Sequence, residues 1–430
     1  MQISDVIYLC LNLLLIYWIF ASFKNHFNQK IWIKVFRQRL VSIALGILII
    51  FWFISILDSI HIYHMSIIDK IFYPLNIYME YSYSRPFDAY LVLPKVKFVD
   101  GHYQAVFSHL NYVPQSFKTT IDIQHVILQN SLWYLVFLGL VSMGIILSIR
   151  KKWHHWADYQ KNIFFMMLTI LMLLFFFIWI YICSRYFHVL GTGQIGQDIL
   201  YQSVKSIRTG MLISLMTTML MLPFALGFGL LAGFYGKTCD VVIQFIYTTI
   251  SSIPSVLFIG ASLLGWQLYI SSHHPAWSMD TIADTRLLMI CVLLGLTDWA
   301  HLCRFIRAEV LKLRELDYIQ SAKLLGSKPY VILFKHLLPN TMHLVITSLV
   351  LNFSYLVLAE SVLTYLGIGV SPLTISWGNM INAARLELAR DPVIWWPLVS
   401  AFIFMFFLVL TCNLFADGLR RALNPREEIH

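Results

Sequence analysis

Charged residues are scarce in this chain of 430 residues: they make up 12% of the sequence, whereas hydrophobic residues make up 59%. A water-soluble globular chain carries about 25% charged residues. Several uninterrupted apolar runs of about 20 residues, the length that crosses a bilayer, accompany a mean hydropathy of +0.71. The composition therefore excludes an ordinary soluble protein and predicts an all-α, polytopic membrane protein.

Cysteine pairs and metal-ligand spacings are also lacking. The six cysteines show no C-x-x-C spacing and most lie inside or beside apolar runs, so we interpret them as small apolar residues. The pairs His154-His155 and His273-His274 consist of adjacent residues, which do not point at one metal ion on a helix. The sequence therefore predicts no metal site.

The N-terminus lacks the basic residues that begin a secretory signal peptide. Met1 to Asp5 contain no Lys or Arg, whereas five basic residues follow the first apolar run between Lys24 and Arg39. Because basic residues favour the cytoplasmic side, this order predicts that the first helix is retained, with its N-terminus outside the cytoplasm.

Nine apolar runs are candidate membrane helices. They cover residues 6–23, 40–57, 131–149, 163–183, 211–234, 241–270, 287–305, 344–366 and 393–415. If the second run crosses from the inside to the outside, the inside connections hold 20 of the 31 Lys and Arg residues. This bias predicts a cytoplasmic C-terminus, and it accounts for the positive net charge without a nucleic-acid partner.

The stretch from Asp58 to Gln129 is the only long polar one. It mixes both charge signs with many aromatic residues and four prolines. It is predicted either to fold as a small extracytoplasmic unit or to extend as a lid over the helices, and both alternatives fit its residues.

The connection formed by residues 304–339 is too long for a simple turn and has a helical pattern interrupted by one glycine. Apolar Ile319, Ala322 and Leu325 recur at a spacing of three. Gly326 follows them and is suited to the left-handed turn that ends a helix. The pattern predicts a helix, a turn and a second helix.

Three further residues define the second helix of this connection. Ser327 is predicted to cap it, Pro329 fits its first turn, and Pro339 is predicted to stop it before the next membrane span. Such an elbow is suited to docking in a groove of a partner. Periodicity alone fits equally an amphipathic helix that lies among lipid headgroups.

This spacing resembles a known motif. The run Ile319 to Ala322, then Gly326, then His336 to Asn340 resembles the EAA motif of ABC-importer permeases, in the form seen in the dipeptide/oligopeptide/nickel permease family. Gln320 and Ser321 stand where that family has Glu and Ala. The resemblance implies that the elbow docks on an ATPase subunit through motif residues and their neighbours. These are Asp317, Tyr318, Gln320, Ser321, Ala322, Gly326, His336, Leu338 and Pro339.

The segment from Leu190 to Leu200 is similar to the same family's LGTDxxGRDxL segment, which precedes the permease core on the outside. Gly193 and Gln197 stand where the family has Asp and Arg, so both halves of a possible charge pair are absent. The resemblance implies an extracytoplasmic motif that also includes a later Ser-Trp-Gly run. Its residues are Gly191, Thr192, Gly196, Asp198, Ser376, Trp377 and Gly378.

Other segments extend the resemblance as far as Arg426. They are the AGYxG-like turn at 232–236, a core helix broken at Pro254, the run 359–370 and the signatures at 417–420 and 424–426. Gly229 and Gly233 form a small-residue face typical of close helix packing.

Polar residues within the apolar runs are candidates for an intramembrane site. Asp298 and His301 lie one turn apart and near Arg304, which favours a hydrated structural role over a metal or proton site. Glu360 stands where the family also has Glu, and it is predicted either to organise helix packing or the pathway, or to make a purely structural hydrogen bond.

The run Gly236-Lys237-Thr238 matches the last three positions of the P-loop motif. Leu231 stands where the P-loop requires glycine, and a membrane helix precedes it in place of a strand. If the chain belongs to a transporter of this kind, ATP must be bound by another chain.

The resemblance implies a type-1 ABC permease core and several additions. The core spans 190–426 and contains the coupling loop at 304–339. Four segments precede the core: an extra helix with a basic lead-in (1–40), the family's first helix (41–57), the extracytoplasmic stretch (58–129) and an inserted hairpin (130–183).

The implied function is that of a non-catalytic permease subunit of an ATP-driven importer of peptides or a related solute in the bacterial cytoplasmic membrane. The implied partners are two ATPase subunits that carry ATP and Mg, a second homologous permease, an extracytoplasmic solute-binding protein and membrane lipid. The alternatives are a secondary transporter or channel, which predicts inverted repeats and paired broken helices, and an integral-membrane enzyme, which needs converging side chains. A scaffold that has lost transport is a further alternative.

Overall fold

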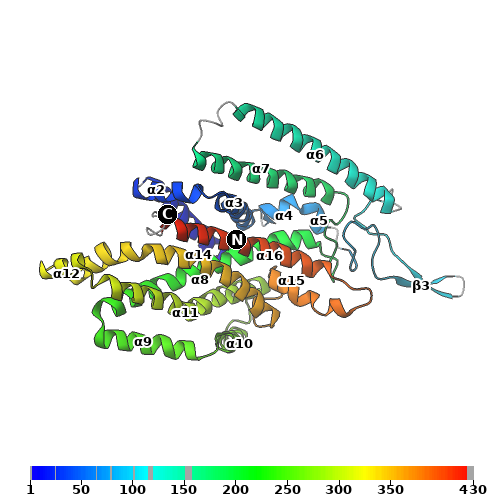
Figure 1. Ribbon diagram of the computed structural model, residues 1–430. Helices are drawn as coiled ribbons and strands as arrows, with labels where there is room; N and C mark the ends of the chain where they lie inside the picture. The colour runs from blue at the N-terminus through cyan, green and yellow to red at the C-terminus, as the bar shows by residue number, and fades with distance from the viewer. Residues whose placement is uncertain are drawn as a thin grey trace. The chain divides into compact units, whose positions relative to one another are not determined.

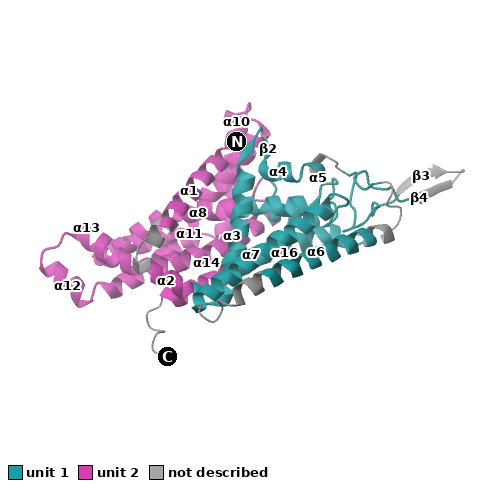
Figure 2. Ribbon diagram, turned by 90° about the horizontal axis from the view of Figure 1, so that it is seen from above, with its two compact units in different colours: residues 1, 36–210, 375–411 teal, residues 2–35, 211–374, 412–430 magenta. Residues whose placement is uncertain are grey.

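The computed structural model describes residues 2–24, 26–63, 65–77, 80–99, 102–114, 120–150 and 157–423. The described chain is mostly helical and forms two compact units (Figures 1 and 2). Unit 1 consists of residues 36–210 and 375–411, and unit 2 of residues 2–35, 211–374 and those from 412 onward. The signature predicted at 424–426 and the pair His154-His155 lie outside the described residues.

Unit 1 combines long helices with two short antiparallel hairpins. Its elements are α3 (Arg39–Ser59), β1 (His61–Ile62), β2 (Met65–Ser66), α4 (Ile67–Ile71), α5 (Tyr73–Ile77), β3 (Lys95–Val99), β4 (His102–Val106), α6 (Thr120–Arg150), α7 (Asp158–Ser184), α15 (Trp377–Ala384), the 3-10 turn η3 (Glu387–Ala389), and the first parts of α8 (Ile199–Tyr235) and α16 (Trp396–Leu423).

Helices α3 and α7 pack closely against each other. A Cβ added to Gly46 on α3 would lie 3.2 Å from Cγ of Met166 on α7, so the glycine permits the close approach. The Arg39 guanidinium lies 4.0 Å from the ring centroid of Phe165, and Asn162 donates to the Arg37 carbonyl at 2.7 Å. One helix of the predicted inserted hairpin is thus a direct neighbour of the predicted first family helix.

The polar stretch after α3 folds back onto α7 and α8, and we call its described residues between 58 and 114 the cap. Its buried apolar side chains share one core with those of residues 183–204. The shared core contains Ile68, Phe72, Leu75, Ala89, Leu91, Leu110 and Val113 from the cap, with Cys183, Phe187, Val189, Leu200, Tyr201 and Val204. The apolar side chains of the cap are therefore packed together with those of residues 183–204, and both alternatives predicted for this stretch stay predictions.

Unit 2 holds the remaining helices. Its elements are α1 (Ile3–Lys24), most of α2 (His26–Phe36), the second part of α8, α9 (Lys237–Ser252), α10 (Ser255–His273), α11 (Met279–Leu313), α12 (Asp317–Leu324), α13 (Pro329–Val331), the π-helical turn η2 (Ile332–Leu337), α14 (Leu338–Tyr365) and the last turns of α16. A buried apolar core runs along α8, α11 and α14.

Small residues allow α8 and α11 to meet closely, as predicted. A Cβ added to Gly229 would lie 2.8 Å from Cβ of Ile306, and one added to Gly233 would lie 2.6 Å from Cβ of Val310. At the other end of α11, Ser4 of α1 donates its backbone N–H to a carboxylate oxygen of Asp284 at 3.2 Å. The additional first helix is thus packed against α11.

Six described helical segments are long and apolar enough to cross a membrane: α3, α7, α8, α10, the continuous run from α13 to α14, and α16. Shorter apolar helical stretches cover 3–17 and 125–141. The multi-span helical architecture agrees with the sequence, while the count of nine spans stays a prediction.

Two prolines differ in their effect on the helices. Pro254 separates α9 from α10, as predicted, because it has no N–H to donate. Pro339 was predicted to end a helix, and this is wrong, since the helical run continues from Pro329 to Tyr365. The π-helical turn η2 ends at Leu337, two residues before Pro339, and such a widened turn accommodates the missing hydrogen bond and the bulk of the ring.

Candidate functional site

The elbow, which we define as Glu315–Pro339, begins with α12 and turns at a glycine. Gly326 has φ of +74°, its N–H donates to the Lys323 carbonyl at 3.0 Å, and the N–H of Ser327 donates to the Ala322 carbonyl at 3.0 Å. This is the left-handed helix end that the sequence predicts. Nothing lies within 4 Å of a Cβ added to Gly326, so only backbone conformation restricts this position.

The second helix of the elbow starts one residue later than predicted. Lys328 is its N-cap residue and makes no side-chain capping bond, so the prediction that Ser327 caps it is wrong. The Ser327 N–H closes the glycine turn instead. Pro329 occupies the first turn, as predicted, where no N–H is needed.

The elbow has a buried base and an exposed tip. Ile319 is fully buried against Ile332 and Leu337, whereas the side chains of Leu324 and Leu325 are 89% and 85% exposed. The apolar residues that recur at a spacing of three therefore do not share one environment. Two adjacent leucines in water leave apolar area that a partner could cover.

Motif residues from both arms of the elbow meet at its base. Asn340 donates its side-chain N–H to the Tyr318 hydroxyl at 3.0 Å, and the ring centroids of Tyr318 and His336 lie 6.5 Å apart. Gln320 donates its Nε2 to the Arg314 carbonyl at the end of α11, at 2.9 Å. A carboxylate could not donate this bond, so glutamine at this position has a specific structural role.

The other predicted elbow residues have different exposure. Asp317, Ser321 and Pro339 are exposed, while Ala322 and Leu338 are partly buried.

A group of contacts joins the C-terminal end of α11 to the turn between α8 and α9, and we call this group the clasp. Arg307 binds Asp240 through two hydrogen bonds, Nε to Oδ1 and Nη2 to Oδ2, the latter at 2.6 Å. The Arg307 bond lowers the pKa of the Asp240 carboxyl despite its partial burial. Asp240 in turn raises the pKa of Arg307, so the two form a stable ion pair.

Arg314 and Lys323 complete the clasp. Arg314 donates Nη1 to the Gly233 carbonyl at 3.2 Å, and a Cβ added to Gly236 would lie 2.8 Å from this nitrogen. Lys323 of α12 lies over the ring of Phe234, 5.3 Å from its centroid. The Arg314 side chain and the left-handed backbone (φ +62°) explain the glycine at 236 in the AGYxG-like turn. Sequence reasoning missed Asp240, whose partner lies 67 residues away.

The segment from Leu190 to Leu200, here called the glycine motif, is covered by the cap. Thr192 is fully buried: its hydroxyl donates to the Ser82 carbonyl at 2.8 Å and accepts the N–H of Ser84 at 2.7 Å. Gly191 and Gly196 have φ of +73° and +74°, and a Cβ at either would overlap the cap backbone. The predicted extracytoplasmic residues are thus buried under the cap and do not form a surface.

Asp198 is also buried, and it binds a histidine that sequence reasoning missed. His188 Nδ1 lies 2.7 Å from one carboxylate oxygen, and the other accepts the N–H of Tyr201 at 2.8 Å. At the positions that depart from the family pattern, Gly193 donates its N–H to the Gln197 carbonyl at 2.8 Å. The turn is therefore closed by backbone without a charge pair.

The Ser-Trp-Gly run lies in the same unit as the glycine motif. Ser376 caps α15 by accepting the N–H of Asn379 at 3.1 Å, and Trp377 donates its indole N–H to the Ser203 carbonyl at 3.1 Å. Gly378 is buried. These residues stabilise the local fold.

A second connection between the cap and α8 is ionic. Asp69 accepts hydrogen bonds from Lys205 and from the Tyr201 hydroxyl, the latter at 2.7 Å. Burial alone would raise the pKa of Asp69, but its bonds with Lys205, Tyr201 and Ser66 outweigh burial and lower it.

Glu360 lies near the C-terminal end of α14 and is hydrogen-bonded there. It is buried and accepts the Thr364 hydroxyl at 2.9 Å, and the same hydroxyl oxygen accepts the N–H of Val370 at 3.3 Å. Arg286 donates to the neighbouring Gly369 carbonyl at 2.8 Å. This arrangement supports a packing role for Glu360.

Asp298 and His301 do not converge with Glu360 on a ligand. Asp298 is hydrogen-bonded by Asn352, and His301 packs edge-on against Phe305 with ring centroids 4.9 Å apart. Within the described ranges, no three His, Cys, Asp or Glu side chains group as metal ligands.

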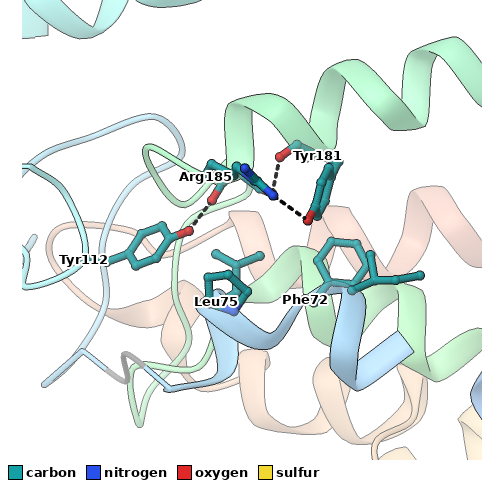
Figure 3. Close-up of a pocket in the computed structure, with 8 residues that line it drawn as sticks. Phe72, Leu75, Tyr112, Tyr181 and Arg185 are labelled. Atoms are coloured by element: carbon teal, nitrogen blue, oxygen red, sulfur yellow. Dashed lines mark hydrogen bonds between the residues drawn. The ribbon is translucent and has the colours of Figure 1, made fainter. Parts of the chain in front are cut away.

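One shallow cleft in unit 1 is shown in Figure 3. It lies between the cap and the end of α7, and its lining includes Phe72, Leu75 and Arg185. Arg185 donates to the Tyr181 hydroxyl at 3.3 Å, and Tyr112 donates to the Ser184 carbonyl at 2.6 Å. The cleft has no room for a molecule the size of water, so it cannot hold a solute such as a peptide.

Comparison with known proteins matches residues 225–429 to the family "Binding-protein-dependent transport system inner membrane component". A putative peptide permease protein of Brucella suis is 28% identical over 246 residues, which cover 56% of this chain and 74% of that protein. The dipeptide transport system permease protein DppC of Lactococcus lactis is 29% identical over 239 residues, 56% of this chain and 64% of the relative. The oligopeptide transport system permease protein OppC of Bacillus subtilis is 27% identical over 239 residues, 56% and 72% of the two chains.

Proposed function

We propose that this chain is the permease subunit of an ATP-driven peptide importer, because its residues 225–429 match the family of inner membrane components of binding-protein-dependent transport systems. This family is non-catalytic, and its members are multi-pass inner membrane proteins. The names of the relatives, which are peptide, dipeptide and oligopeptide permeases, support peptides as the solute class.

The observation that carries the proposal is the exposed tip of the elbow. Leu324 and Leu325 lie at the end of a short helix whose base is fixed by buried Ile319 and by the bond from Gln320. An exposed apolar tip on a fixed base is suited to insertion into a groove. We assign this groove to an ATPase subunit, which binds the ATP and Mg, and place the elbow in the cytoplasm.

The other partners follow from the same premise. A transporter needs a complete pathway, so we propose a second permease beside this chain, two ATPase subunits, an extracytoplasmic solute-binding protein and surrounding lipid. We place the N-terminus and the cap outside and the C-terminus inside, with nine membrane crossings and a permease core at 190–426. Because the cap covers the glycine motif, we propose that the cap contacts the binding protein.

Transport in proteoliposomes tests this function. The chain and its co-purifying subunits are reconstituted with the binding protein outside, ATP inside and a casein digest as the peptide source. The proposal expects peptides to accumulate only with hydrolysable ATP. Accumulation without ATP would contradict it and would favour a secondary transporter. With the cap deleted, unchanged docking of the binding protein would contradict the role of the cap.

A further inference from the structure

Helix α9 contacts α11 at three points along its length, the first of which belongs to the clasp. Asp240 binds Arg307 near its start, the Tyr247 ring lies 4.9 Å beneath the Arg304 guanidinium in its middle, and Ser251 accepts from Arg304 at 3.0 Å near its end. Contacts spread over the whole helix restrict both sliding and rotation.

Of these contacts, the pair Asp240–Arg307 has the most defined geometry. The side chains are 16% and 23% exposed, so solvent screens them less than a surface pair. Two parallel N–H to oxygen bonds fix the direction as well as the distance of the partners. Apolar contacts such as those of Ile243 permit small shifts, whereas a bidentate pair does not.

The far end of α9 has the opposite character. The helix ends at Ser252, and Pro254 provides no N–H that could continue its hydrogen bonds into α10. Only the backbone of Ile253 and Pro254 joins the two helices directly, so the helical hydrogen bonds are interrupted between α9 and α10.

The inner end of α11 leads directly into the elbow. Only residues 314–316 separate α11 from α12, and Gln320 binds back to the Arg314 carbonyl. Lys323 and Arg314 contact the α8–α9 turn at Phe234 and Gly233. Side-chain contacts therefore join the elbow to the end of α11, both of these to the end of α8, and α11 to α9.

From this geometry we infer that Arg307 is a positioning residue for transport: held by Asp240, it makes α9 move together with α11 and the elbow. Rotation is then released at Pro254, between α9 and α10. The inference rests on the proposed function, because the movement originates in the ATPase subunits that grip the elbow.

Distance measurement by spin labels tests the shared movement. Labels are placed at Val241→Cys on α9 and Lys312→Cys on α11, both exposed, after Cys10→Ser and Cys239→Ser remove the two cysteines that are not buried. In the assembled importer, the distance is expected to stay constant when ATP and vanadate are added. With Asp240→Asn, the distance should broaden or shift on the same addition. A distance that changes in the wild-type chain would overturn the inference.

Uptake measurements provide the functional readout. Asp240→Asn and Arg307→Gln are expected to retain ATPase co-purification but to lower peptide uptake per ATP about tenfold, within the usual range of coupling energies. The exchanged pair Asp240→Arg with Arg307→Asp should restore most of the coupling. The control is Glu309→Gln, which removes a charge partner of Lys312 within α11 itself, 3.4 Å away, and should leave coupling unchanged.

The outcomes separate this inference from the proposed function. If the wild-type chain couples uptake to ATP and Asp240→Asn couples equally well, only the inference is overturned. If the single variants lose the ATPase and the exchanged pair does not recover it, the pair has an assembly role, and the inference is again overturned. If the wild-type chain recovers no ATPase, the proposed function itself is wrong.

Discussion

Two regions of this molecule use a glycine with the same backbone conformation for opposite purposes. Gly326 in the elbow and Gly196 in the glycine motif both have φ of +74°. Nothing approaches a Cβ at Gly326, whereas a Cβ at Gly196 would overlap the backbone of Glu80. The elbow uses the turn to present an exposed tip, and the glycine motif uses it to let the cap approach. A left-handed glycine thus indicates a turn, and only its surroundings indicate whether the turn is a contact.

The two regions also differ in how they are held. The cap is bound through backbone hydrogen bonds, such as that from the Thr192 N–H to the Ser84 carbonyl at 3.2 Å, and through a shared apolar core, and it buries the residues that it covers. The elbow is bound at its base by side chains such as Gln320, and it leaves Leu324 and Leu325 exposed. The first arrangement suits a permanent seal, and the second suits an interface with another chain.

The largest expected effect is at Gly196, where the cap covers the glycine motif. Gly196→Ala introduces both a left-handed alanine, which costs about 1–2 kcal/mol, and an overlap with the cap backbone. We expect unit 1 to lose roughly 3 kcal/mol or more, measured by thermal unfolding in detergent and by protease cleavage of the cap. Gly326→Ala is the matched control, because only the conformational cost applies there. Equal destabilisation by the two substitutions would contradict the comparison.

The next effect concerns the tip. Replacing both Leu324 and Leu325 by Ser removes apolar area that is exposed in the chain alone, so folding should be unchanged. If the ATPase covers both side chains, each contributes about 1.5–3 kcal/mol, and ATPase co-purification should fall at least about tenfold. Leu386→Ser, at an exposed leucine in unit 1, is the control. Undiminished co-purification would show that the tip is not the docking surface.

A smaller effect is expected at the base of the elbow. Gln320→Glu removes the donated bond to the Arg314 carbonyl and places a negative charge at the C-terminal end of α11. We expect a loss of about 1 kcal/mol in local stability, which appears as faster amide hydrogen exchange in α12. Ser321→Glu adds the same charge without removing the bond. Identical exchange in both variants would contradict a structural role for Gln320.

The smallest effect is a dependence on pH at the cap. Because the folded protein lowers the pKa of Asp69 below its ordinary value of 3.8, the carboxylate stabilises the cap at neutral pH and its contribution is lost as pH falls through the lowered pKa. Asp69→Asn should therefore increase pepsin cleavage of the cap near pH 5, and this difference from the wild type should diminish at lower pH. A difference that grows with acidity would contradict this sign.

Local features of the fold were predictable from the sequence, and long-range ones were not. The turn at Gly326 and the break at Pro254 depend on the conformational limits of single residues, and both are confirmed. The stop at Pro339 failed because a π-helical turn compensates for proline, which no simple periodicity reveals. The prediction that Ser327 is the N-cap residue is wrong because the second helix begins one residue later, with Lys328 at that position.

The candidate site shows the same division. The elbow residues follow a fixed spacing within one connection, so the sequence identified them together. The clasp and the cap depend on partners far apart in the chain: Asp240 and Arg307 are separated by 67 residues, and Ser84 and Thr192 by 108. Sequence spacing therefore located the glycine motif but not its burial beneath the cap.

The most direct test of the central claim is gentle-detergent purification of the tagged chain from its native membrane, followed by mass spectrometry of the proteins that accompany it. We expect an ABC ATPase and a second permease to accompany the wild-type chain, and the ATPase to be lost when Leu324 and Leu325 are replaced. Recovery of the chain alone, with solute transport in liposomes that needs no ATP, would contradict it.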